Sequence, residues 1–496
     1  MPPVDHECPL TEYVSKQGKL LEEQAARILA LESELLALKR MAFGKKSEKM
    51  PSLQKALGIE PVPFEEQQKT RQERAALREK LPVKRVEHKV SEADKVCSSC
   101  GGTDTFTALG AGKVTSVIEH IPEQFIRVEH VQEVLRCSCG GGVVTASGAP
   151  KVIEGGKYGA SVLAHLVVSK CINHTPLYRL EKTYKHQGVL MPRSTMNNLF
   201  HRAAQRLQPL SALLLQTIRE RPIVQADETP LLMQDDGSGK SKKGFVWVFL
   251  AHDEQGKLDV AYVFASNRSG STPSAVLGGT RGALLVDGYS GYNVVTDIDG
   301  RDRAGCHAHV RREFFDASKT EPIAHEALAL ILDLYRVEHE AKERRIVGTD
   351  EHLRLRIEKS APIREKLFAW LHERVGRHLP KSGIGKAITY TINQWENLGL
   401  FLTDAKIPLD NNAGEREMRR IAMGRKNYLF VGNDSSGKNM AGLYSLLATC
   451  EARGINPAEY IEDMLVRIDD HPASKLDELL PANWSLAKKI PQDDTA

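Results

Sequence analysis

The chain has 496 residues, which is too long for one ordinary hydrophobic core and predicts about three folding units. Hydrophobic residues make up 41% of the sequence and charged residues 27%, which excludes a chain that is disordered, collagen-like or coiled coil throughout. The net charge of +4, from 68 Lys and Arg against 64 Asp and Glu, is too small to indicate nucleic-acid binding by itself.

The first 50 residues contain a heptad pattern of apolar side chains. One heptad position holds Val14, Leu21, Ile28, Leu35 and Ala42, and the other holds Leu31 and Leu38, with Gln17 and Gln24 as interruptions. We predict a leucine-zipper-like helix in residues 1–50 that joins two copies of the chain. The alternative is an amphipathic helix that packs against its own chain.

Residues 51–90 form a charged linker in which positive charge is concentrated. Between Lys69 and Lys89 the sequence holds eight Lys and Arg against three Glu, a local charge of +5. This basic linker is either a solvated helix face or a surface that contacts DNA phosphates.

Two closely spaced pairs of cysteines occur within residues 91–150: Cys97 with Cys100, and Cys137 with Cys139. Each pair precedes glycines that let the backbone wrap around thiolates, a pattern typical of a structural Zn²⁺ site in a small β module. The second pair has a single intervening residue, so it cannot form the same turn as the first. A mixed site in which His120 or His130 replaces one thiolate, and a module without metal, therefore stay open.

Residues 151–218 have a helical pattern. Helices are predicted at 161–170, 177–186 and 194–204, with Gly188 as the break before the third helix. This arrangement indicates a helix-turn-helix whose last helix enters the major groove of DNA. The side chains that would reach DNA are Arg193, Asn197 and Arg202. Many helical hairpins bind nothing, so a purely structural hairpin is the alternative.

Residues 219–435 change to a mixed α/β pattern. Strands are predicted at 222–232, 244–251, 258–265 and 282–286, with the second and third forming a hairpin. The fourth strand is a continuous apolar run, which is typical of a strand buried on both faces. A Leu-rich helical block is expected at 325–402, a helix at 411–422 and a C-terminal helical region at 436–496.

Two aspartates stand where a carboxylate is costly to bury. Asp227 lies inside the first strand next to Glu228, and side chains alternate faces along a strand, so one of the two faces the core. Asp287 ends the apolar strand, where an open α/β sheet presents residues to a ligand. Two such carboxylates on neighbouring strands are explained if a divalent cation offsets their mutual repulsion.

A third acid, Glu415, is predicted on the helix that begins near residue 411. It shares one helix face with Asn411, whereas Glu417 is rotated by about 200° from it. Three such acids predict a site for two Mg²⁺ ions acting on a phosphodiester, with Mn²⁺ as a substitute. The candidate ligands are Asp227, Asp287 and Glu415. The alternative is that any one of them is a turn, cap or surface residue.

Several unlinked motifs occur together in one order along the chain. They are the Leu-rich N-terminal helix, Phe43–Lys49, the paired cysteines, Gln225–Thr229, Val286–Tyr289, Cys306–Arg312 and the segment from Asp410–Asn412 to Phe430. In combination they resemble the insertion-sequence-sixty-six family of DDE transposases over nearly the whole chain. The chain departs from this pattern at its second cysteine pair and at His307, where the family often has an aromatic residue.

The resemblance implies a ribonuclease-H-like catalytic core in residues 219–435, interrupted by a helical insertion at 318–405. It implies that Asp227, Asp287 and Glu415 are the metal-binding triad of that core. It also implies DNA cleavage and strand transfer at the inverted ends of an insertion element, together with small accessory proteins encoded beside the transposase gene.

Basic residues near the triad are candidates for contacts with DNA phosphates. These candidates are His309, Arg311, Arg312, Arg419, Arg425 and Lys426. The alternatives are surface ion pairs for the arginines and a satisfied core histidine for His309. Cys306 and His309 also have the spacing of half a metal site, which is more often structural than a second zinc site.

These observations predict a multidomain α/β DNA transposase that uses Mg²⁺ for catalysis and Zn²⁺ for structure. Its partners would be the terminal inverted repeats, target DNA and at least one further copy of the chain. The sequence has no apolar run of the ~20 residues that a membrane span needs, so we expect a cytoplasmic, nucleoid-associated protein without a membrane partner. The alternatives are a catalytically inactive zinc-containing DNA-binding regulator and a metal-dependent nuclease or phosphatase without strand transfer.

Overall fold

The computed structural model describes residues 72, 76, 79, 123–136, 143–146, 152–153, 156–234, 241–296 and 300–485. The predicted zipper, almost all of the basic linker and the four paired cysteines lie outside these residues. The chain divides into two units, 1–113 and 114–496. All of the helices and strands given below belong to the second unit.

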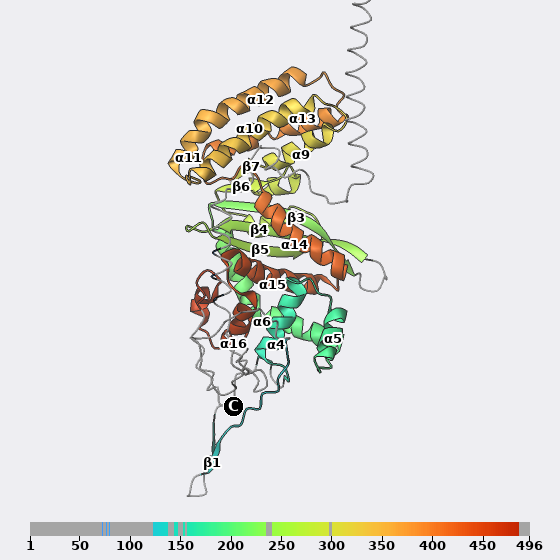
Figure 1. Cartoon of the computed structure of the whole chain (residues 1–496), viewed down its shortest axis with the longest axis vertical. Coiled ribbons are helices and arrows are strands. Elements are labelled where there is room, and N and C mark those ends of the chain that lie inside the picture. The colour runs from blue at the N-terminus through green and yellow to red at the C-terminus, as the bar shows by residue number, and fades with distance from the viewer. Residues whose placement is uncertain are drawn as a thin grey trace, which may run out of the picture. The chain divides into compact units, whose positions relative to one another are not determined.

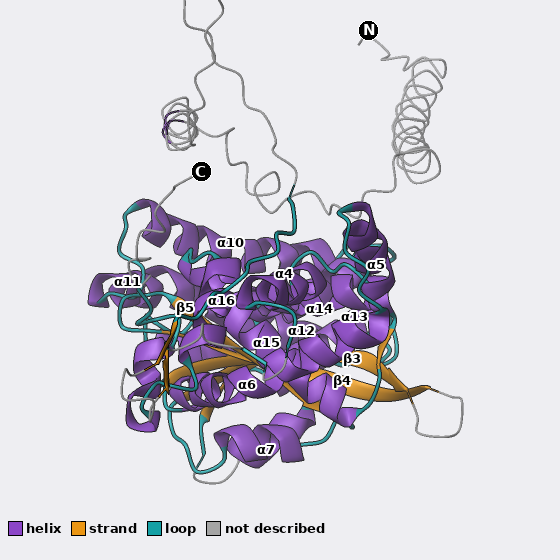
Figure 2. Cartoon of the chain, turned by 90° about the horizontal axis from the view of Figure 1, so that it is seen from below, coloured by secondary structure: helices purple, strands orange, loops and turns teal. Residues whose placement is uncertain are grey.

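A mixed six-stranded sheet forms the centre of this unit (Figures 1 and 2). The strand order is β5-β4-β3-β6-β7, with β8 pairing with β3 beyond this path. Strand β4 is antiparallel to β3 and β5, whereas β6 and β8 are parallel to β3, and β7 is parallel to β6. The strands are β3 (Ile223–Gln234), β4 (Ser241–His252), β5 (Leu258–Ala265), β6 (Ala283–Val286), β7 (Asp302–Gly305) and β8 (Phe430–Val431).

The predicted hairpin and the predicted buried strand are both confirmed. Strands β4 and β5 pair from Phe245 opposite Ala265 to His252 opposite Leu258. All four residues of β6 are buried, because Leu284 and Val286 pack in the main core, whereas Ala283 and Leu285 pack in a second apolar cluster. A separate two-stranded antiparallel hairpin is formed by β1 (Val134–Arg136) and β2 (Val143–Thr145).

The N-terminal helices share one hydrophobic core with the sheet. These helices are α4 (Ala160–Cys171), α5 (Leu177–His186) and α6 (Arg193–Arg219). Helix α6 is much longer than the predicted 194–204, because buried apolar residues continue at helical spacing through Leu207, Leu214 and Ile218. It packs against α15 (Asp434–Arg453) and β5, so the helical region is not packed separately from the sheet.

Helix α15 also protects the edge of the sheet. The backbone N–H groups of Val260 and Tyr262 in the edge strand β5 donate to Thr449 Oγ1 (3.0 Å) and Ser445 Oγ (2.8 Å). These two hydroxyls are one helical turn apart, so a single helix face satisfies donors that an edge strand would otherwise leave open. The C-terminal end of the described chain continues through α16 (Pro457–Arg467) and the 3₁₀ turn η5 (Ala473–Leu479).

A group of helices with its own core is inserted between β7 and α14 (Asn412–Tyr428). Figure 1 shows these helices as a layer next to β6 and β7. Leu285 of β6 and Ala304 of β7 join Phe401 and Leu409 in a second apolar cluster that links the layer to the sheet. The layer consists of α9 (His307–Ala317), α10 (Ala324–Glu343), α11 (Asp350–Leu355), the π-helical turn η3 (Arg356–Ser360), α12 (Ala361–Arg374), α13 (Gly383–Asn393) and the 3₁₀ helix η4 (Asn397–Leu402).

Short helical elements connect β5, β6 and β7: α7 (Ser271–Leu277), the 3₁₀ turn η2 (Ser290–Tyr292) and α8 (Asn293–Thr296). Within the part of the chain that the structure describes, no helix is long and apolar enough to cross a membrane.

Arg301, which directly precedes β7, links the end of α6 to the segment before β6. Its side chain is buried, and its Nη2 donates to the carbonyl oxygens of Arg219 (2.6 Å) and Arg221 (2.9 Å) at the end of α6. Its Nε donates to Thr280 Oγ1 (2.8 Å) just before β6. Burial lowers the pKa of Arg301 to about 10, so the guanidinium stays charged at neutral pH and these carbonyl groups depend on it.

We expect Arg301→Met to lower the free energy of unfolding by at least about 3 kcal/mol, because each buried carbonyl left without a donor costs about 1–3 kcal/mol. Urea denaturation followed by circular dichroism measures this change. The exposed Arg281 lies nearby, and Arg281→Met should change the same quantity by less than about 0.5 kcal/mol. Equal effects of the two substitutions would contradict the role given to Arg301.

Candidate active site

Asp227 lies on the central strand β3 in a partly buried, acidic environment. Burial, together with the negative charges of Glu228, Asp287 and Glu415, raises its pKa to about 7, although the backbone N–H of Glu228 opposes the shift by donating to Asp227 Oδ1 (2.8 Å). The structure therefore brings the three predicted triad acids within electrostatic reach of one another, although they come from three separate parts of the chain.

Asp287 directly follows β6 and begins a tight loop. Its Oδ1 accepts a hydrogen bond from the backbone N–H of Tyr289 (2.9 Å), which fixes the carboxylate at the end of the strand. Arg303 in β7 also holds this loop. Its Nη2 donates to the carbonyl oxygens of Asp287 (2.6 Å) and Tyr289 (2.8 Å).

Glu415 lies in the first turn of α14, where Arg312 from α9 contacts it. Arg312 Nη2 donates to Glu415 Oε1 (2.7 Å), and His309 Nε2 is 3.9 Å from the same oxygen. Glu417 points elsewhere and accepts from the hydroxyl of Tyr262 (2.8 Å). The helix therefore presents only one of its two neighbouring glutamates to the other acids.

Two side chains fasten α14 to β3 on either side of Asp227. The buried Asn411 donates from Nδ2 to the carbonyl oxygen of Ala226 (2.8 Å), and Arg425 donates from Nη1 to Thr229 Oγ1 (3.1 Å) and the carbonyl oxygen of Pro230 (2.8 Å). Helical periodicity places Asn411 on the face of Glu415, but no local pattern gives Asn411 a role, because its partner is 185 residues away.

The donor set of this site suits a hard divalent cation. Asp227 and Asp287 would supply carboxylate oxygens. The pKa of Asp227 is raised first by burial and then by the neighbouring carboxylates, and Mg²⁺ would offset the negative charge of these carboxylates. Among the described residues, no three His, Cys, Asp or Glu side chains are arranged to hold a metal ion. Glu415 would complete the set by exchanging Arg312 for the cation.

A polar cavity of about 500 Å³ lies beside the Asp287 loop. One wall comes from this loop and β7, and the other from the end of α13 and from η4. The lining includes Gly288, Ser290, Asn293, Asn393, Gln394 and Asn397. A Cβ atom on Gly288 would come within 2.8 Å of Tyr390 Cε2, so the insertion packs directly on the loop that carries Asp287.

The basic residues predicted to contact DNA near the triad have different surroundings. Arg312 and His309 contact Glu415, and Arg425 fastens α14 to β3, so these three already have intramolecular partners. Arg419 and Lys426 are exposed on α14, and Arg311 is partly exposed on α9.

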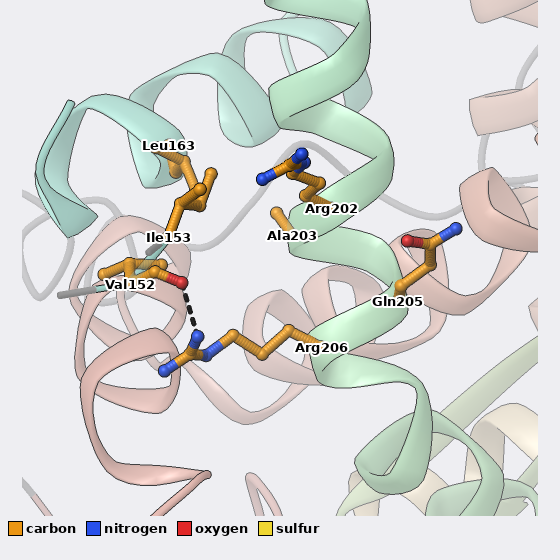
Figure 3. Close-up of a pocket in the computed structure, with 7 residues that line it drawn as sticks. All are labelled: Val152, Ile153, Leu163, Arg202, Ala203, Gln205 and Arg206. Atoms are coloured by element: carbon orange, nitrogen blue, oxygen red, sulfur yellow. Dashed lines mark hydrogen bonds between the residues drawn. The ribbon is translucent and has the colours of Figure 1, made fainter. Parts of the chain in front are cut away.

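The predicted recognition helix is the first part of α6. Asn197 and Arg202 are exposed, and Arg193 lies 3.3 Å from Glu181 of α5. Figure 3 shows Arg202 and Arg206 extending from α6 towards Val152, Ile153 and Leu163, which line a cavity of about 220 Å³. Arg206 is held there by the carbonyl oxygen of Val152 and by Asp469, so Arg202 is the better candidate for a DNA contact.

Cys306 and His307 both have buried, structural surroundings. The imidazole of His307 is buried edge-on against Phe401 (5.3 Å between ring centroids), and its Nδ1 lies 3.0 Å from the carbonyl oxygen of Leu409. Burial lowers the pKa of His307 to about 4, so a neutral ring fills this aromatic position. Burial raises the pKa of the Cys306 thiol to about 12, and the thiol accepts a hydrogen bond from the backbone N–H of Asn411 (3.2 Å). Both observations indicate a structural role for Cys306.

Three family profiles together match most of the chain between residues 94 and 482. The profile of the "Transposase IS66 family" matches residues 155–439, which include the triad acids. The "IS66 C-terminal element" matches residues 445–482, and the "zinc-finger binding domain of transposase IS66" matches residues 94–140, which include all four paired cysteines. The chain belongs to the IS66 family of transposases, the insertion-sequence-sixty-six family that its motifs resemble, and this membership supports a DNA-binding function of transposase type.

Three proteins of Sinorhizobium fredii (strain NBRC 101917 / NGR234) are similar to the chain. "Uncharacterized protein y4jD" is 30% identical over 498 residues, which cover 94% of this chain and 96% of that protein. "Uncharacterized protein y4hP" is 29% identical, with coverages of 93% and 89%. "Uncharacterized protein y4qI" is 34% identical, with coverages of 69% and 66%.

We expect Asp227→Asn to stabilise the metal-free protein in a pH-dependent manner. Folding raises the pKa of Asp227 from its ordinary value of 3.8 to about 7, so the stability of the native state falls as pH rises between these two values and stays low above pH 7. The thermal midpoint of the Asn variant should exceed that of the wild type clearly at pH 8, less at pH 5 and not at pH 4. If the difference in thermal midpoint between the two proteins did not change with pH, the raised pKa of Asp227 would be contradicted. Asp316→Asn, at an exposed position, is the control and should show no such pH-dependent difference.

Arg202→Ala should weaken binding to duplex DNA and reduce the slope of log affinity against log salt by about 1, because one phosphate contact is lost. Fluorescence anisotropy at several salt concentrations measures both quantities. Arg354→Ala removes the same charge from an exposed position on α11 and should leave the slope unchanged. If both variants behave alike, Arg202 does not contact phosphate.

Proposed function

We propose that this chain cuts DNA at the ends of an insertion element and joins the freed ends to target DNA. The carrying observation is that acids from β3, the end of β6 and α14 lie within electrostatic reach of one another, so that Asp287 and Glu415 add to the effect of burial in raising the pKa of Asp227. A cluster of carboxylates of this kind can hold divalent cations next to a phosphodiester.

The topology supports a ribonuclease-H-like core for this chemistry. In chain order, three antiparallel strands (β3, β4 and β5) precede two strands parallel to the first (β6 and β7), and β3 is central. The carboxyl ends of parallel strands meet at one edge of a sheet, which suits Asp287 at the end of β6 as a partner of Asp227. The helical layer between β7 and α14 corresponds to the predicted insertion.

Each residue of the site would have a separate task. Asp227, Asp287 and Glu415 would hold two Mg²⁺ ions, with Mn²⁺ as a substitute, and bound metal would supply activation of a water or 3′-hydroxyl and stabilisation of the leaving oxygen. Asn411 and Arg425 keep α14 in place beside Asp227. Arg312, which now neutralises Glu415, would move to the phosphate of the DNA when Glu415 takes up its ligand role.

The remaining parts of the chain would bind DNA and assemble the complex. Cys97, Cys100, Cys137 and Cys139 would hold a structural Zn²⁺ ion, which the zinc-finger match over residues 94–140 supports. Arg193, Asn197 and Arg202 at the start of α6 would contact the terminal inverted repeats. The predicted zipper in residues 1–50 would join copies of the chain in a nucleoid-associated assembly that includes small accessory proteins.

A second candidate function is that of a catalytically inactive DNA-binding regulator. One observation favours it: Arg312 occupies Glu415 Oε1, and the described side chains do not form a three-ligand metal site as they stand. The two functions differ in whether DNA and metal together displace this ion pair, so a cleavage assay separates them.

Wild-type protein with Mg²⁺ or Mn²⁺ should cut supercoiled DNA at the element's own ends, and Asp287→Asn should reduce the rate by about a thousandfold or more. Gel analysis of the cut plasmid, with any products of neighbouring genes added, provides the measurement. The exposed Asp316→Asn should cut at the wild-type rate. End-specific binding without cutting under every metal and partner condition would favour the regulator, and full activity of Asp287→Asn would exclude the proposed triad.

A further inference from the structure

Glu228 is a buried carboxylate on the opposite face of β3 from Asp227. Its side chain is only 2% exposed. Its Oε1 accepts hydrogen bonds from Arg268 Nε (2.8 Å) and Nη2, and its Oε2 accepts from the hydroxyl of Tyr292 (2.6 Å). Both oxygens are therefore engaged within the protein, and the carboxylate has a task other than that of a metal ligand.

The partners of Glu228 hold the loop that begins with Asp287. The guanidinium of Arg268 lies over the ring of Tyr289, with 3.8 Å from Cζ to the ring centroid. The hydroxyl of Tyr289 donates back to the carbonyl oxygen of Arg268 (2.8 Å), and its backbone N–H donates to Asp287 Oδ1 (2.9 Å). A continuous series of contacts thus runs from Glu228 through Arg268 and Tyr289 to Asp287.

Aromatic packing makes the other branch of this connection rigid. Trp247 of β4 stands directly opposite Glu228 in the sheet, and its ring packs edge-on against Tyr292 (5.6 Å between centroids). Trp247 and Tyr292 are both buried. The hydroxyl of Tyr292 is therefore fixed where Glu228 accepts its hydrogen bond.

We propose that Glu228 is a positioning residue that sets the place of Asp287 relative to Asp227 through Arg268, Tyr289 and Tyr292. The inference rests on the proposed function, because it takes Asp227 and Asp287 as metal ligands. Its physical basis is that the two acids stand on neighbouring strands, while the loop after β6 needs a fixed support to keep its carboxylate at a constant distance from β3.

The fold should survive the loss of this support. Arg303 holds the Asp287 loop independently from β7, and β6 is buried between β3 and β7. Removing the charge of Glu228 should therefore displace Asp287 without unfolding the sheet. This expectation makes Glu228→Gln a usable test, because glutamine keeps the shape and still accepts from Tyr292.

The experiment measures Mn²⁺ binding to the full-length chain by titration calorimetry and by the Mn²⁺-dependent rise of the thermal midpoint. Glu228→Gln should raise the Kd for Mn²⁺ about tenfold, and Arg268→Lys, which keeps the charge but loses the planar contact with Tyr289, should raise it in the same direction. In the cleavage assay, Glu228→Gln should recover most of its rate at saturating Mn²⁺, whereas Asp287→Asn should not.

Glu417→Gln is a matched control. Glu417 also accepts from a tyrosine hydroxyl, that of Tyr262 (2.8 Å), and from an arginine, Arg420 (3.3 Å), but these partners belong to β5 and α14 and not to the loop that carries Asp287. Glu417→Gln should lower the thermal midpoint without changing the Kd for Mn²⁺. An unchanged Kd in Glu228→Gln, or an equal change in Glu417→Gln, would overturn the positioning role. Weaker Mn²⁺ binding in Glu228→Gln alone supports that role even if the wild type cuts no DNA, in which case only the proposed catalysis fails.

Discussion

The site depends on the cost of gathering several carboxylates around one central strand. Burial and three neighbouring acids raise the pKa of Asp227 to about 7, so the native state carries unfavourable charge wherever that group ionises. The surrounding contacts are explained by this cost. Arg312 neutralises Glu415, Arg303 holds the Asp287 loop, and Asn411 fastens α14 to the carbonyl group that precedes Asp227. Such a charged arrangement persists only when its neighbours leave it no room to relax.

The two faces of β3 have different roles in the site. Asp227 faces the acids that would do chemistry, whereas Glu228, one residue later, faces a scaffold of Arg268, Tyr292 and Trp247. The alternation of side chains along a strand makes this division possible within two residues. The sheet supplies the necessary stiffness, because the Ser445 and Thr449 hydroxyls of α15 satisfy the edge of β5 and Arg301 ties the start of β6 to the end of α6.

Local patterns in the sequence predicted the parts of the fold that depend on neighbouring residues. The apolar run of β6, the β4–β5 hairpin and the helix carrying Glu415 follow from periodicity alone. The predicted end of α6 at residue 204 was wrong, because the buried face of the helix continues past Pro209 to Ile218. Contacts such as Asn411 with Ala226 and Arg425 with Thr229 join residues 185 and 196 positions apart, so no local pattern could reveal them. The same is true of the contacts of His307 with Phe401 and the carbonyl oxygen of Leu409, although the resemblance marks this position as one that is often aromatic.

The Arg312–Glu415 ion pair links DNA binding to metal binding under the proposed function. Arg312 is about half exposed, so a DNA phosphate can reach it, and a phosphate accepts a charge-assisted hydrogen bond at least as well as a carboxylate. Transfer of Arg312 to DNA would leave Glu415 with an unpaired negative charge beside Asp227, which increases the attraction of the site for a divalent cation. Metal binding to Glu415 would in turn release Arg312 for DNA. Because linkage is reciprocal, each ligand would raise the affinity for the other, and the acids would assemble into a metal site chiefly when DNA is present.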